Sequence, residues 1–388
     1  MDLGEKALGL HEKARGKIEI AGKVDVKGDA ELSLVYTPGV AEVCRAIAKD
    51  EKLAYKYTSK WNSVAIVTDG TRVLGLGDIG PLAAMPVMEG KSLLYKKFGG
   101  VDAYSVCLAT KNADEIVAVV KALAPNYAAI NLEDIESPKC FEIFDRLEAE
   151  LGLPVYHDDR HGTAVVALAG LINALKLAGK GEGKRKRQEV AIVVNGAGAA
   201  GTGIANLLVD YGFCDVVACD THGALYVGRE HLDWHKQKLA RMTNANGRKG
   251  PLAEVMSGAD VFIGASAPNV LTEGMVRAMA SKPIVFALAN PVPEISPELA
   301  REAGAFIYAT GRSDLPNQIN NAVASPGLLR GVLDSGAKKI TPKMMLAAAE
   351  AIAGVVKKPS RSCIVPKLFD KRLAPAVAKA VMKAASGN

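Results

Sequence analysis

The sequence predicts an α/β protein built on largely parallel sheets. Short apolar runs alternate with longer segments of helical periodicity, which is the pattern of strands joined by crossover helices. Apolar residues make up 49% of the chain, with 38 glycines and only 5% aromatics, a composition that suits an α/β fold. The stretch 155–164 lies where two halves of different character meet. We therefore expect an N-terminal α/β domain, 1–160, and a C-terminal α/β domain, 161–388.

Length and charge limit the partners of the chain. The 388 residues allow two or three domains with a large buried core. The net charge of +6 comes from scattered lysines and one basic run, Lys184–Arg187. Because this run has no interleaved aromatics and precedes an apolar strand, we interpret it as a solvated interdomain turn and expect no nucleic acid partner. The charge supports only a mild attraction for anionic substrates.

The cysteines and the N-terminus predict the cellular setting. The six cysteines are dispersed without a C-x-x-C pair, which argues against a disulfide framework or a zinc knuckle and favours a reducing compartment. Charged residues interrupt the start of the chain, so it does not read as a signal peptide, and no apolar run reaches the roughly 18 residues of a membrane span. We expect a soluble, cytoplasmic protein with no membrane partner.

The N-terminal elements are less distinctive. Residues 1–30 predict a helix followed by an exposed loop, and 34–40 predict a strand-like approach to a turn before a helix over 41–49. Tyr36 lies beside that turn, where its phenol could project into a cleft. Its alternative role is amphipathic packing, with the hydroxyl bonded to the backbone.

A predicted hairpin and a glycine motif follow. The segments 63–68 and 73–77 are predicted strands joined by a turn at Asp69-Gly70. The segment 75–80 reads G-x-G-x-x-G, the dinucleotide-binding pattern. We interpret it as a decoy, because that pattern needs a following strand that ends in an acid, and the next predicted strand, 103–108, runs into Ala-Thr-Lys instead.

The segment 81–98 is a predicted helix that carries Glu89-Gly-Lys91. Gly90 inside a helix costs about 1 kcal/mol relative to alanine. We infer from this cost that another group approaches the backbone closely at Gly90. For Lys91 the alternative is a solvated surface charge.

Strands and helices then alternate regularly. The predicted helices are 112–124, capped by Asn112, 138–151 and 162–178, and the predicted strands lie near residues 103, 127 and 154. This alternation predicts a largely parallel sheet whose functional residues cluster at the carboxyl ends of its strands.

Paired acids follow two successive apolar runs of this sheet. Glu133 and Asp134 come after one run, and Asp158 and Asp159 come after the next. Such hard oxygen ligands favour Mg²⁺ or Mn²⁺ over zinc. On a regular strand Glu133 and Asp134 would point to opposite faces, so both can bind one ion only if the chain leaves the strand there. The alternative is that these acids cap helices or face solvent.

The second half carries a complete dinucleotide-binding unit. A buried strand, 189–194, leads into a glycine-rich loop, 195–201, and a helix, 202–211, and the next strand, 215–219, ends in an acid. The candidate cofactor-binding residues are Gly196 for the turn, Ala197, Gly198 for close approach to the pyrophosphate, Gly201 for helix packing and Asp220 for the adenosine ribose. The unit predicts a Rossmann-type, doubly wound NAD(P)-binding domain. A glycine-rich turn without a ligand is the alternative.

The acid at position 220 favours NAD over NADP. A carboxylate at the end of the second strand bonds both ribose hydroxyls and repels a 2′-phosphate. The residues directly after Asp220 include no arginine, although Arg229 or the fold could still bring one near. NAD is therefore the expected cofactor, with NADP as the alternative.

The unit continues with three more predicted strands, at 261–264, 284–289 and 306–309. Asn290 lies at the carboxyl end of the second, beside prolines that stop the strand. The loop 311–321 is dense in amides, which could bond a carboxylate or a nicotinamide ribose, or only form turns. Two alanine-rich helices, 344–356 and 373–385, are expected to cover a sheet edge or a partner subunit.

Taken in order, these motifs resemble those of the malic enzymes. The motifs are Tyr36-Thr-Pro-Gly39, Gly75–Gly80 with Glu89-Gly-Lys91, Asn131-Leu-Glu-Asp134, His157-Asp-Asp159 with Gly162-Thr163, Asn195–Gly201, Ala289-Asn-Pro291 and Asn320-Asn321. The resemblance covers nearly the whole chain, whose length is like that of the short prokaryotic form. It implies oxidative decarboxylation of (S)-malate to pyruvate and CO₂ with NAD(P)⁺ and Mg²⁺ or Mn²⁺, carried out by a homodimer whose N-terminal domain binds the substrate.

The resemblance also implies roles for single residues. They are Glu133, Asp134 and Asp159 as metal ligands, Lys91 as general base, Tyr36 as general acid, Asp158 as an acid behind the ligands, Arg72 as a binder of the malate carboxylate, and Asn290 and Asn321 as amides that contact substrate or nicotinamide.

The chemistry needs these residue types in its own right. Hydride leaves C2 only as its hydroxyl loses a proton, and Lys91 serves as the base if burial and a nearby cation lower its pKa. A metal polarises the new ketone and stabilises the enolate left by CO₂, which a donor of high pKa such as Tyr36 then protonates at C3. Two alternatives are a metal-independent dehydrogenase of a hydroxy or amino acid, and a dinucleotide-binding regulatory module whose site has decayed.

Overall fold

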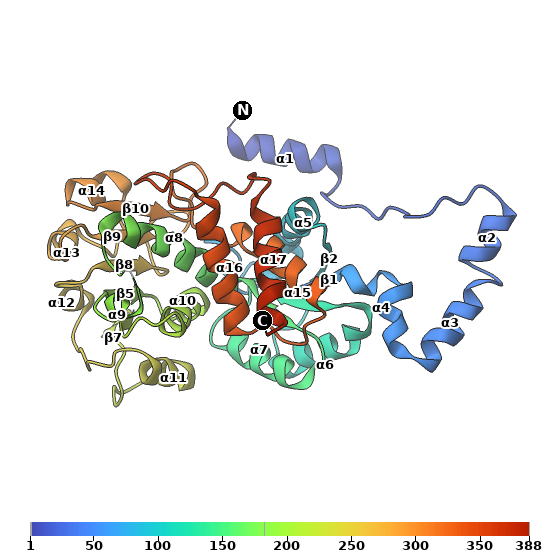
Figure 1. Ribbon diagram of the computed structural model, residues 1–388, viewed down its shortest axis with the longest axis horizontal. Coiled ribbons are helices and arrows are strands. Elements are labelled where there is room, and N and C mark those ends of the chain that lie inside the picture. The colour runs from blue at the N-terminus through green and yellow to red at the C-terminus, as the bar shows by residue number, and fades with distance from the viewer. Residues whose placement is uncertain (1, 182, 388) are drawn as a thin grey trace.

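Two sheets frame the computed structural model, which describes residues 2–181 and 183–387 (Figure 1). The first sheet has the strand order β2-β1-β3-β4, and every pair is parallel. Its strands are β1 (Ser63–Thr68), β2 (Asp102–Cys107), β3 (Ala129–Leu132) and β4 (Val155–His157). The chain after β3 and the chain after β4 therefore emerge side by side at one edge of this sheet. The predicted α/β class is confirmed.

Helices cover both faces of the first sheet. They are α5 (Gly80–Gly99), α6 (Ala113–Leu123) with the 3₁₀ turn η3 (Ala124–Asn126), and α7 (Lys139–Glu150). Along β1 the side chains alternate, so that Ala65 and Val67 pack in one core cluster and Ile66 packs in the other. Asn112 caps α6 as predicted, because its side-chain oxygen accepts a hydrogen bond of 2.8 Å from the backbone N–H of Asp114.

The second sheet has the strand order β10-β9-β8-β5-β6-β7 and is parallel except for β7. Its strands are β5 (Ala191–Asn195), β6 (Asp215–Asp220), β7 (Gly223–Ala224), β8 (Val261–Gly264), β9 (Ile284–Ala287) and β10 (Ile307–Thr310). The chain moves from β5 to β6 on one side and then crosses back to β8 on the other. At such a reversal a crevice opens at the carboxyl ends of the strands, which is where this fold binds dinucleotides.

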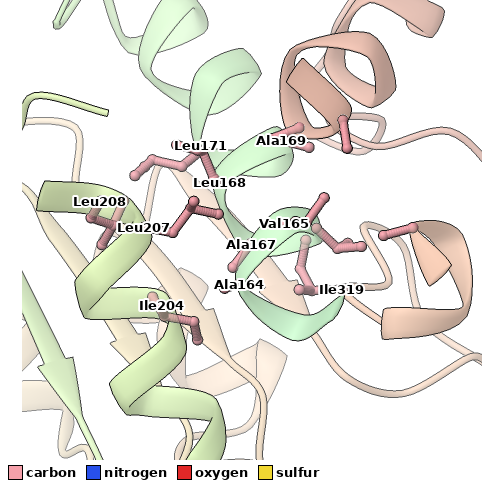
Figure 2. Packing of buried hydrophobic residues seen from close by; sticks show 14 of the residues in the cluster. Ala164, Val165, Ala167, Leu168, Ala169, Leu171, Ile204, Leu207, Leu208 and Ile319 are labelled. Carbon is pink, nitrogen blue, oxygen red and sulfur yellow. The ribbon is translucent and has the colours of Figure 1, made fainter. Parts of the chain in front are cut away.

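Helix α8 (Thr163–Ala178) joins the two sheets along the chain and is buried on nearly all sides. Its Leu168 and Leu171 lie toward Ile204 and Leu208 of α10 (Ala199–Asp210) in the main core (Figure 2). The segment 158–178 is long and apolar enough to cross a membrane, but most of it is buried inside the molecule, as expected of a core helix. The other helices of this half are α9 (Lys184–Arg187), α11 (Trp234–Met242), α12 (Leu252–Met256), α13 (Glu273–Arg277) and α14 (Pro297–Glu302).

Three C-terminal helices pack mainly on other helices. They are α15 (Ser325–Ser335), α16 (Pro342–Val355) and α17 (Leu373–Ala385). Helix α17 packs against α15 and α16, α16 packs against α8, and α15 reaches α5 over the first sheet. The close approach of α17 to α15 requires small residues, since a Cβ at Gly331 would lie 2.6 Å from the carbonyl oxygen of Ala378. Within the chain the alanine-rich composition therefore serves helix packing, where the sequence had suggested a sheet edge, and the covering of a partner subunit stays a prediction.

An N-terminal arm, residues 18–59, reaches away from the rest of the molecule (Figure 1). It follows α1 (Leu3–Ala14) and contains α2 (Asp29–Val35), α3 (Val40–Lys49), η1 (Glu51–Leu53) and α4 (Ala54–Tyr57), with η2 (Ser59–Asn62) at its end. The backbone N–H of Lys17 holds one end on α5 through Glu89, at 3.0 Å, and Nζ of Lys60 holds the other on the carbonyl of Ala124, at 3.1 Å. No described residue between 2 and 61 is buried.

Two predicted strands are wrong. The segment 34–40 continues helix α2 and then turns, because no strand of the described residues pairs with it and acids such as Asp29 in the first turn favour the helix. The segment 73–77 forms only a single bridge, in which the backbone N–H of Val73 donates to the carbonyl of Gly77 at 3.0 Å. The chain folds back on itself over these few residues and leaves no length for a strand.

Candidate active site

Carboxylates gather where β3 and β4 end. These strands are neighbours in register, with Leu132 opposite His157, so the residues that follow them meet. Asp134 has a φ of 53°, in the left-handed region, and the chain leaves the strand there. One carboxylate oxygen from each of Glu133, Asp134 and Asp159 lies within 4.8 Å of the others. We name these three residues the acidic cluster.

The hydrogen bonds around the acidic cluster leave oxygens free for a cation. The backbone N–H of Asp134 donates to Oδ2 of Asp159 at 3.0 Å, and Nδ2 of Asn131 donates to Oε2 of Glu133 at 2.9 Å. Oδ2 of Asp134 is buried and has no hydrogen-bond partner among the described residues. A buried, unpartnered carboxylate oxygen beside two further carboxylates fits Mg²⁺ or Mn²⁺.

The electrostatics support the same interpretation. Burial and the neighbouring Asp159 carboxylate raise the pKa of Asp134 to about 7. Burial also raises the pKa of Glu133 well above its usual range, and it raises the pKa of Asp159. A divalent cation at this place would reverse these shifts, because it favours the ionised carboxylates.

Lys91 extends from α5 into the acidic region and is 8% exposed. Its Nζ lies 2.9 Å from Oε1 of Glu133 and 3.2 Å from Oδ1 of Asn321, and it donates to Asp158. Burial alone would lower the pKa of Lys91, but the Asp158 and Glu133 carboxylates outweigh burial and raise it. The protein residues alone therefore raise the pKa of Lys91, and the lowered pKa expected from the sequence requires the nearby cation, which would compete for the same carboxylates.

Asp158 is fully buried behind Lys91 and accepts a hydrogen bond from the hydroxyl of Ser325. The phenol oxygen of Tyr156 lies 3.2 Å from the same hydroxyl. Gly162 makes this packing feasible, since a Cβ there would lie 2.2 Å from Oδ1 of Asp158 and 2.9 Å from Cβ of Asn321. Sequence reasoning missed the parts played by Ser325 and Tyr156, and only the Ser-Pro-Gly start of α15 offered a signal.

The close approach inferred at Gly90 is not found within the chain. Apart from its own helix backbone and its two neighbours in sequence, no described residue has an atom within 4 Å of where its Cβ would be. The neighbouring Glu89 instead explains part of the motif, because it holds the chain after α1 through the backbone N–H of Lys17.

Of the remaining candidate residues, Arg72 lies at the acidic cluster and Tyr36 lies away from it. The backbone N–H of Arg72 donates to the carbonyl of Asp134 at 3.0 Å, so Arg72 sits beside the acidic cluster. Tyr36 ends α2 on the N-terminal arm, with 67% of its surface exposed, and within one chain the structure does not bring it to Lys91.

A cavity of about 830 Å³ opens beside the second sheet. The residues that line it include Asn195, Gly196, Ala197, Gly198 and Asp220 from the second half of the chain, and Arg72, Ser137 and Pro138 from the first half. We name it the dinucleotide cavity. It lies between the glycine-rich loop and the region of the acidic cluster.

The glycines of the loop have separate structural reasons. Gly196 has a φ of 119°, and a Cβ there would lie 2.3 Å from the carbonyl oxygen of Ala265. A Cβ at Gly201 would lie 1.8 Å from the carbonyl oxygen of Gly196, so α10 packs directly on the turn. At Gly198 the same position is open, which leaves room for a phosphate at the start of α10.

Asp220 at the end of β6 is already paired. Its carboxylate accepts from Nη2 of Arg229 at 2.7 and 2.6 Å and from Nζ of Lys236 at 3.0 Å. Burial would raise the pKa of Asp220, but hydrogen bonds from Arg229, His222 and Lys236 lower it. The fold thus brings Arg229 to the acid.

Asn290 follows β9 and is exposed. A Cβ at Gly75 would lie 2.9 Å from the carbonyl oxygen of Asn290, and a Cβ at Gly311 would lie 2.4 Å from its Nδ2. The G-x-G-x-x-G segment 75–80 therefore contacts the second half of the molecule by letting Asn290 approach.

A Rossmann-type sheet whose cavity is lined by Arg72, which lies beside buried carboxylates, defines a nicotinamide-dependent oxidoreductase. Residues 15–114 and 109–148 match the family "Malic enzyme, N-terminal domain", and residues 161–386 match "Malic enzyme, NAD binding domain". The chain belongs to the malic enzyme family.

Individual proteins that are similar to this chain are also malic enzymes. The chain is 53% identical over 388 residues to the bifunctional malic/malolactic enzyme of Bacillus subtilis, covering 99% of this chain and 93% of the relative. It is 52% identical to the NAD-dependent malic enzyme of Geobacillus stearothermophilus, covering 95% of this chain and 77% of the relative. A crystal structure of the NAD-dependent malic enzyme of Thermotoga maritima superposes with a TM-score of 0.92 at 49% identity, covering 97% of this chain and 98% of that one.

Proposed function

We propose that this chain catalyses the oxidative decarboxylation of (S)-malate to pyruvate and CO₂, with NAD(P)⁺ as the hydride acceptor and Mg²⁺ or Mn²⁺ as the metal. One observation carries the proposal: Lys91 is buried 2.9 Å from Glu133, beside the acidic cluster and near the dinucleotide cavity. A base, a hard cation and a nicotinamide are the three components that the reaction requires.

The absorbance of NADH in the presence of malate and Mn²⁺ tests the proposal. We expect NADH to form with Mn²⁺, to stop forming in EDTA and to form again when Mn²⁺ is restored. Activity that persists in EDTA would instead favour a metal-independent dehydrogenase of a hydroxy or amino acid. No NADH formation with malate under any of these conditions would favour a decayed regulatory module.

Glu133, Asp134 and Asp159 would hold the metal. When bound there, a divalent cation supplies Lewis-acid chemistry at the C2 oxygen of malate. Its charge would also draw Glu133 away from Lys91 and so favour the neutral amine. The protein's part is to hold three carboxylates, within 4.8 Å of one another, in a buried site before the ion arrives.

Lys91 is the proposed general base for the C2 hydroxyl. Hydride leaves C2 as this proton moves to Nζ, which Asp158 and Asn321 orient through their hydrogen bonds. Asp158 acts on the reaction only through Lys91, since it lies fully buried behind it. Asn321 is the proposed amide contact to substrate or nicotinamide on the same side.

Arg72 and Asn290 are the proposed residues on the cofactor side. Arg72 lines the dinucleotide cavity next to the acidic cluster, so its guanidinium could bind a malate carboxylate. Asn290 lies at the carboxyl end of β9, packed against Gly75 and Gly311, where its amide could contact the substrate or the nicotinamide.

We further propose a homodimer in which the N-terminal arm reaches the partner. Tyr36, the proposed donor of the proton to C3, stands exposed on this arm. Large apolar side chains of the arm are also exposed, among them Ile20, Val24 and Leu34. Exposed apolar surface of this kind marks a protein interaction site. Docking of the arm on a second copy would cover that surface and bring the exposed phenol of Tyr36 toward the site of the partner.

We propose that the chain prefers NAD as its cofactor and that it can also bind NADP. Asp220 supports NAD by its position at the end of β6. Arg229 and Lys236 beside it support acceptance of a 2′-phosphate, because together they outweigh the charge of the one carboxylate.

We propose that the chain forms two domains, an N-terminal malate- and metal-binding domain, 1–160, and an NAD(P)-binding domain with C-terminal helices, 161–388. The two separate sheets support it. A cytoplasmic location is supported by dispersed free cysteines.

A further inference from the structure

A buried carboxylate ties the strand ends of the second sheet together. Glu294 lies between β9 and α14 and is fully buried. Its Oε1 accepts a hydrogen bond of 3.0 Å from the backbone N–H of Ser266, and its Oε2 accepts one of 3.0 Å from the backbone N–H of Ala289. Ser266 follows β8 and Ala289 follows β9, so one side chain holds both loops.

The network reaches the dinucleotide cavity. The hydroxyl of Ser266 lies 3.3 Å from Oε1 of Glu294, and it accepts a hydrogen bond of 2.9 Å from Nδ2 of Asn195, the last residue of β5. Asn195 and Ser266 both line the cavity. Ala289 directly precedes Asn290. Glu294 therefore connects three adjacent strand ends at the point where the sheet reverses.

Burial of the Glu294 carboxylate costs free energy and restricts the residues around it. Among the described residues, no basic side chain forms an ion pair with it, and burial raises its pKa although hydrogen bonds from Ala289 and Ser266 oppose the shift. A buried carboxylate without a cationic partner is destabilising. Strand β8 must also end in glycine, since a Cβ at Gly264 would lie 2.5 Å from Cδ of Glu294. A residue with only a packing role would need neither a buried carboxylate nor a glycine at position 264.

We propose that Glu294 is a positioning residue for the dinucleotide: its carboxylate fixes Ser266 and Ala289, and through them the wall of the dinucleotide cavity and the place of Asn290. Glu294 acts through these neighbours, not on the reacting atoms. The inference rests on the proposed function in so far as Asn290 contacts substrate or nicotinamide.

The variant Glu294→Gln tests the proposal. Its side chain keeps the shape but turns an N–H₂ group toward one of the two backbone N–H donors. We expect the Kd for NADH, measured by NADH fluorescence in the intact protein, and the KM for NAD⁺ to rise about tenfold, with a smaller fall in kcat. The affinity for Mn²⁺ should stay unchanged, because the acidic cluster belongs to the other sheet. A role in stability alone would not produce this selective loss.

Two further variants keep the test decisive. Ser266→Ala removes the hydroxyl between Asn195 and Glu294, and combined with Glu294→Gln its effect on the NADH Kd should be less than additive. Glu298→Gln, an exposed acid on α14, is the matched control and should leave the NADH Kd unchanged.

Unchanged NADH affinity in Glu294→Gln and Ser266→Ala, with both proteins folded, would overturn the proposal. Equal losses of NADH and Mn²⁺ affinity would also overturn it, because they indicate general destabilisation. Failure of the wild-type protein to oxidise malate would count against the proposed function and not against Glu294, whose effect on NADH binding is measured without malate.

Discussion

Nζ of Lys91 lies 3.2 Å from Oδ1 of Asn321, although 230 residues separate them in the chain. Lys91 comes from α5 over the first sheet, and Asn321 comes from η5 (Asn321–Val323), just before α15. Because α15 also packs on α5, the start of the C-terminal helices lies beside the site. The site is therefore assembled from both halves of the chain.

Lys91→Ala should nearly abolish turnover. Loss of a general base lowers kcat by about 10²- to 10⁴-fold, and here the substitution also leaves Glu133 and Asp158 without their cation. The dinucleotide cavity does not include Lys91, so the NADH affinity should stay unchanged. Steady-state kinetics and NADH fluorescence measure the two quantities. Normal malate decarboxylation in this variant would reject Lys91 as the base.

Asp159→Ala should raise the Mn²⁺ concentration needed for half-maximal activity by about tenfold or more, because it removes one of the three carboxylates proposed to bind the ion. The backbone N–H of Asp134 also loses its acceptor. A Mn²⁺ titration of activity measures the effect. The control is Glu150→Gln, an exposed acid of α7 paired with Lys121, which should titrate like the wild type. An Asp159→Ala titration that overlays the wild type would remove Asp159 from the ligand set.

Gly162→Ala should destabilise the protein and impair catalysis together. A Cβ at Gly162 would lie 2.2 Å from Oδ1 of Asp158, and such overpacking costs about 1–3 kcal/mol or more. Asp158 orients Lys91, so kcat should fall as well. Thermal unfolding and kinetics check both effects. The control is Gly152→Ala, where nothing lies within 4 Å of the new Cβ, and equal behaviour of the two variants would contradict the packing argument.

Local rules could predict most of the second sheet and the acidic cluster. In the loop before α10, Gly196 provides a positive φ, and Gly201 leaves room for the carbonyl oxygen of Gly196, five residues earlier; such local needs are visible in the sequence. Glu133 and Asp159 meet because parallel neighbouring strands end at one edge, which the alternation of strands and helices predicts.

Contacts between distant segments could not be predicted in this way. The sequence shows that Lys91 is present but not that two carboxylates surround it, so the direction of its pKa shift depended on the fold. Ser325 and Glu294 are ordinary polar residues in the sequence, and only their burial gives them a role. The strand predicted for the segment 34–40 is wrong because apolar residues exposed on an arm resemble those of a strand in a sheet.

Lys236→Glu should weaken the use of NADP⁺ more than that of NAD⁺. Lys236 and Arg229 both donate to Asp220, and a 2′-phosphate placed there would carry about two negative charges. Reversing the charge of Lys236 should lower kcat/KM for NADP⁺ at least about tenfold relative to NAD⁺. Lys238→Glu, on the same helix and outside the dinucleotide cavity, is the control. Equal changes with both cofactors would exclude Lys236 from discrimination.

Mixed dimers should show which subunit Tyr36 serves. Tyr36→Phe and Lys91→Ala should each be inactive alone. If the N-terminal arm delivers Tyr36 to the partner, a mixed dimer holds one site with an intact Lys91 from one chain and an intact Tyr36 from the other. Random pairing of equal amounts makes half of the dimers mixed, so co-expression should restore about a quarter of the wild-type activity.

A second pairing supplies the control for the mixed dimers. Lys91 and Asp159 belong to one site of one chain, where Lys91 contacts Glu133 of the acidic cluster. Co-expression of Lys91→Ala with Asp159→Ala should therefore restore no activity, because every site in the mixed dimer lacks one of the two residues. Restoration only in the pairing that includes Tyr36→Phe would establish the exchange. If the pairing of Tyr36→Phe with Lys91→Ala restores no activity in a protein that sediments as a dimer, Tyr36 acts in its own subunit. The N-terminal arm would then have to fold back onto its own chain.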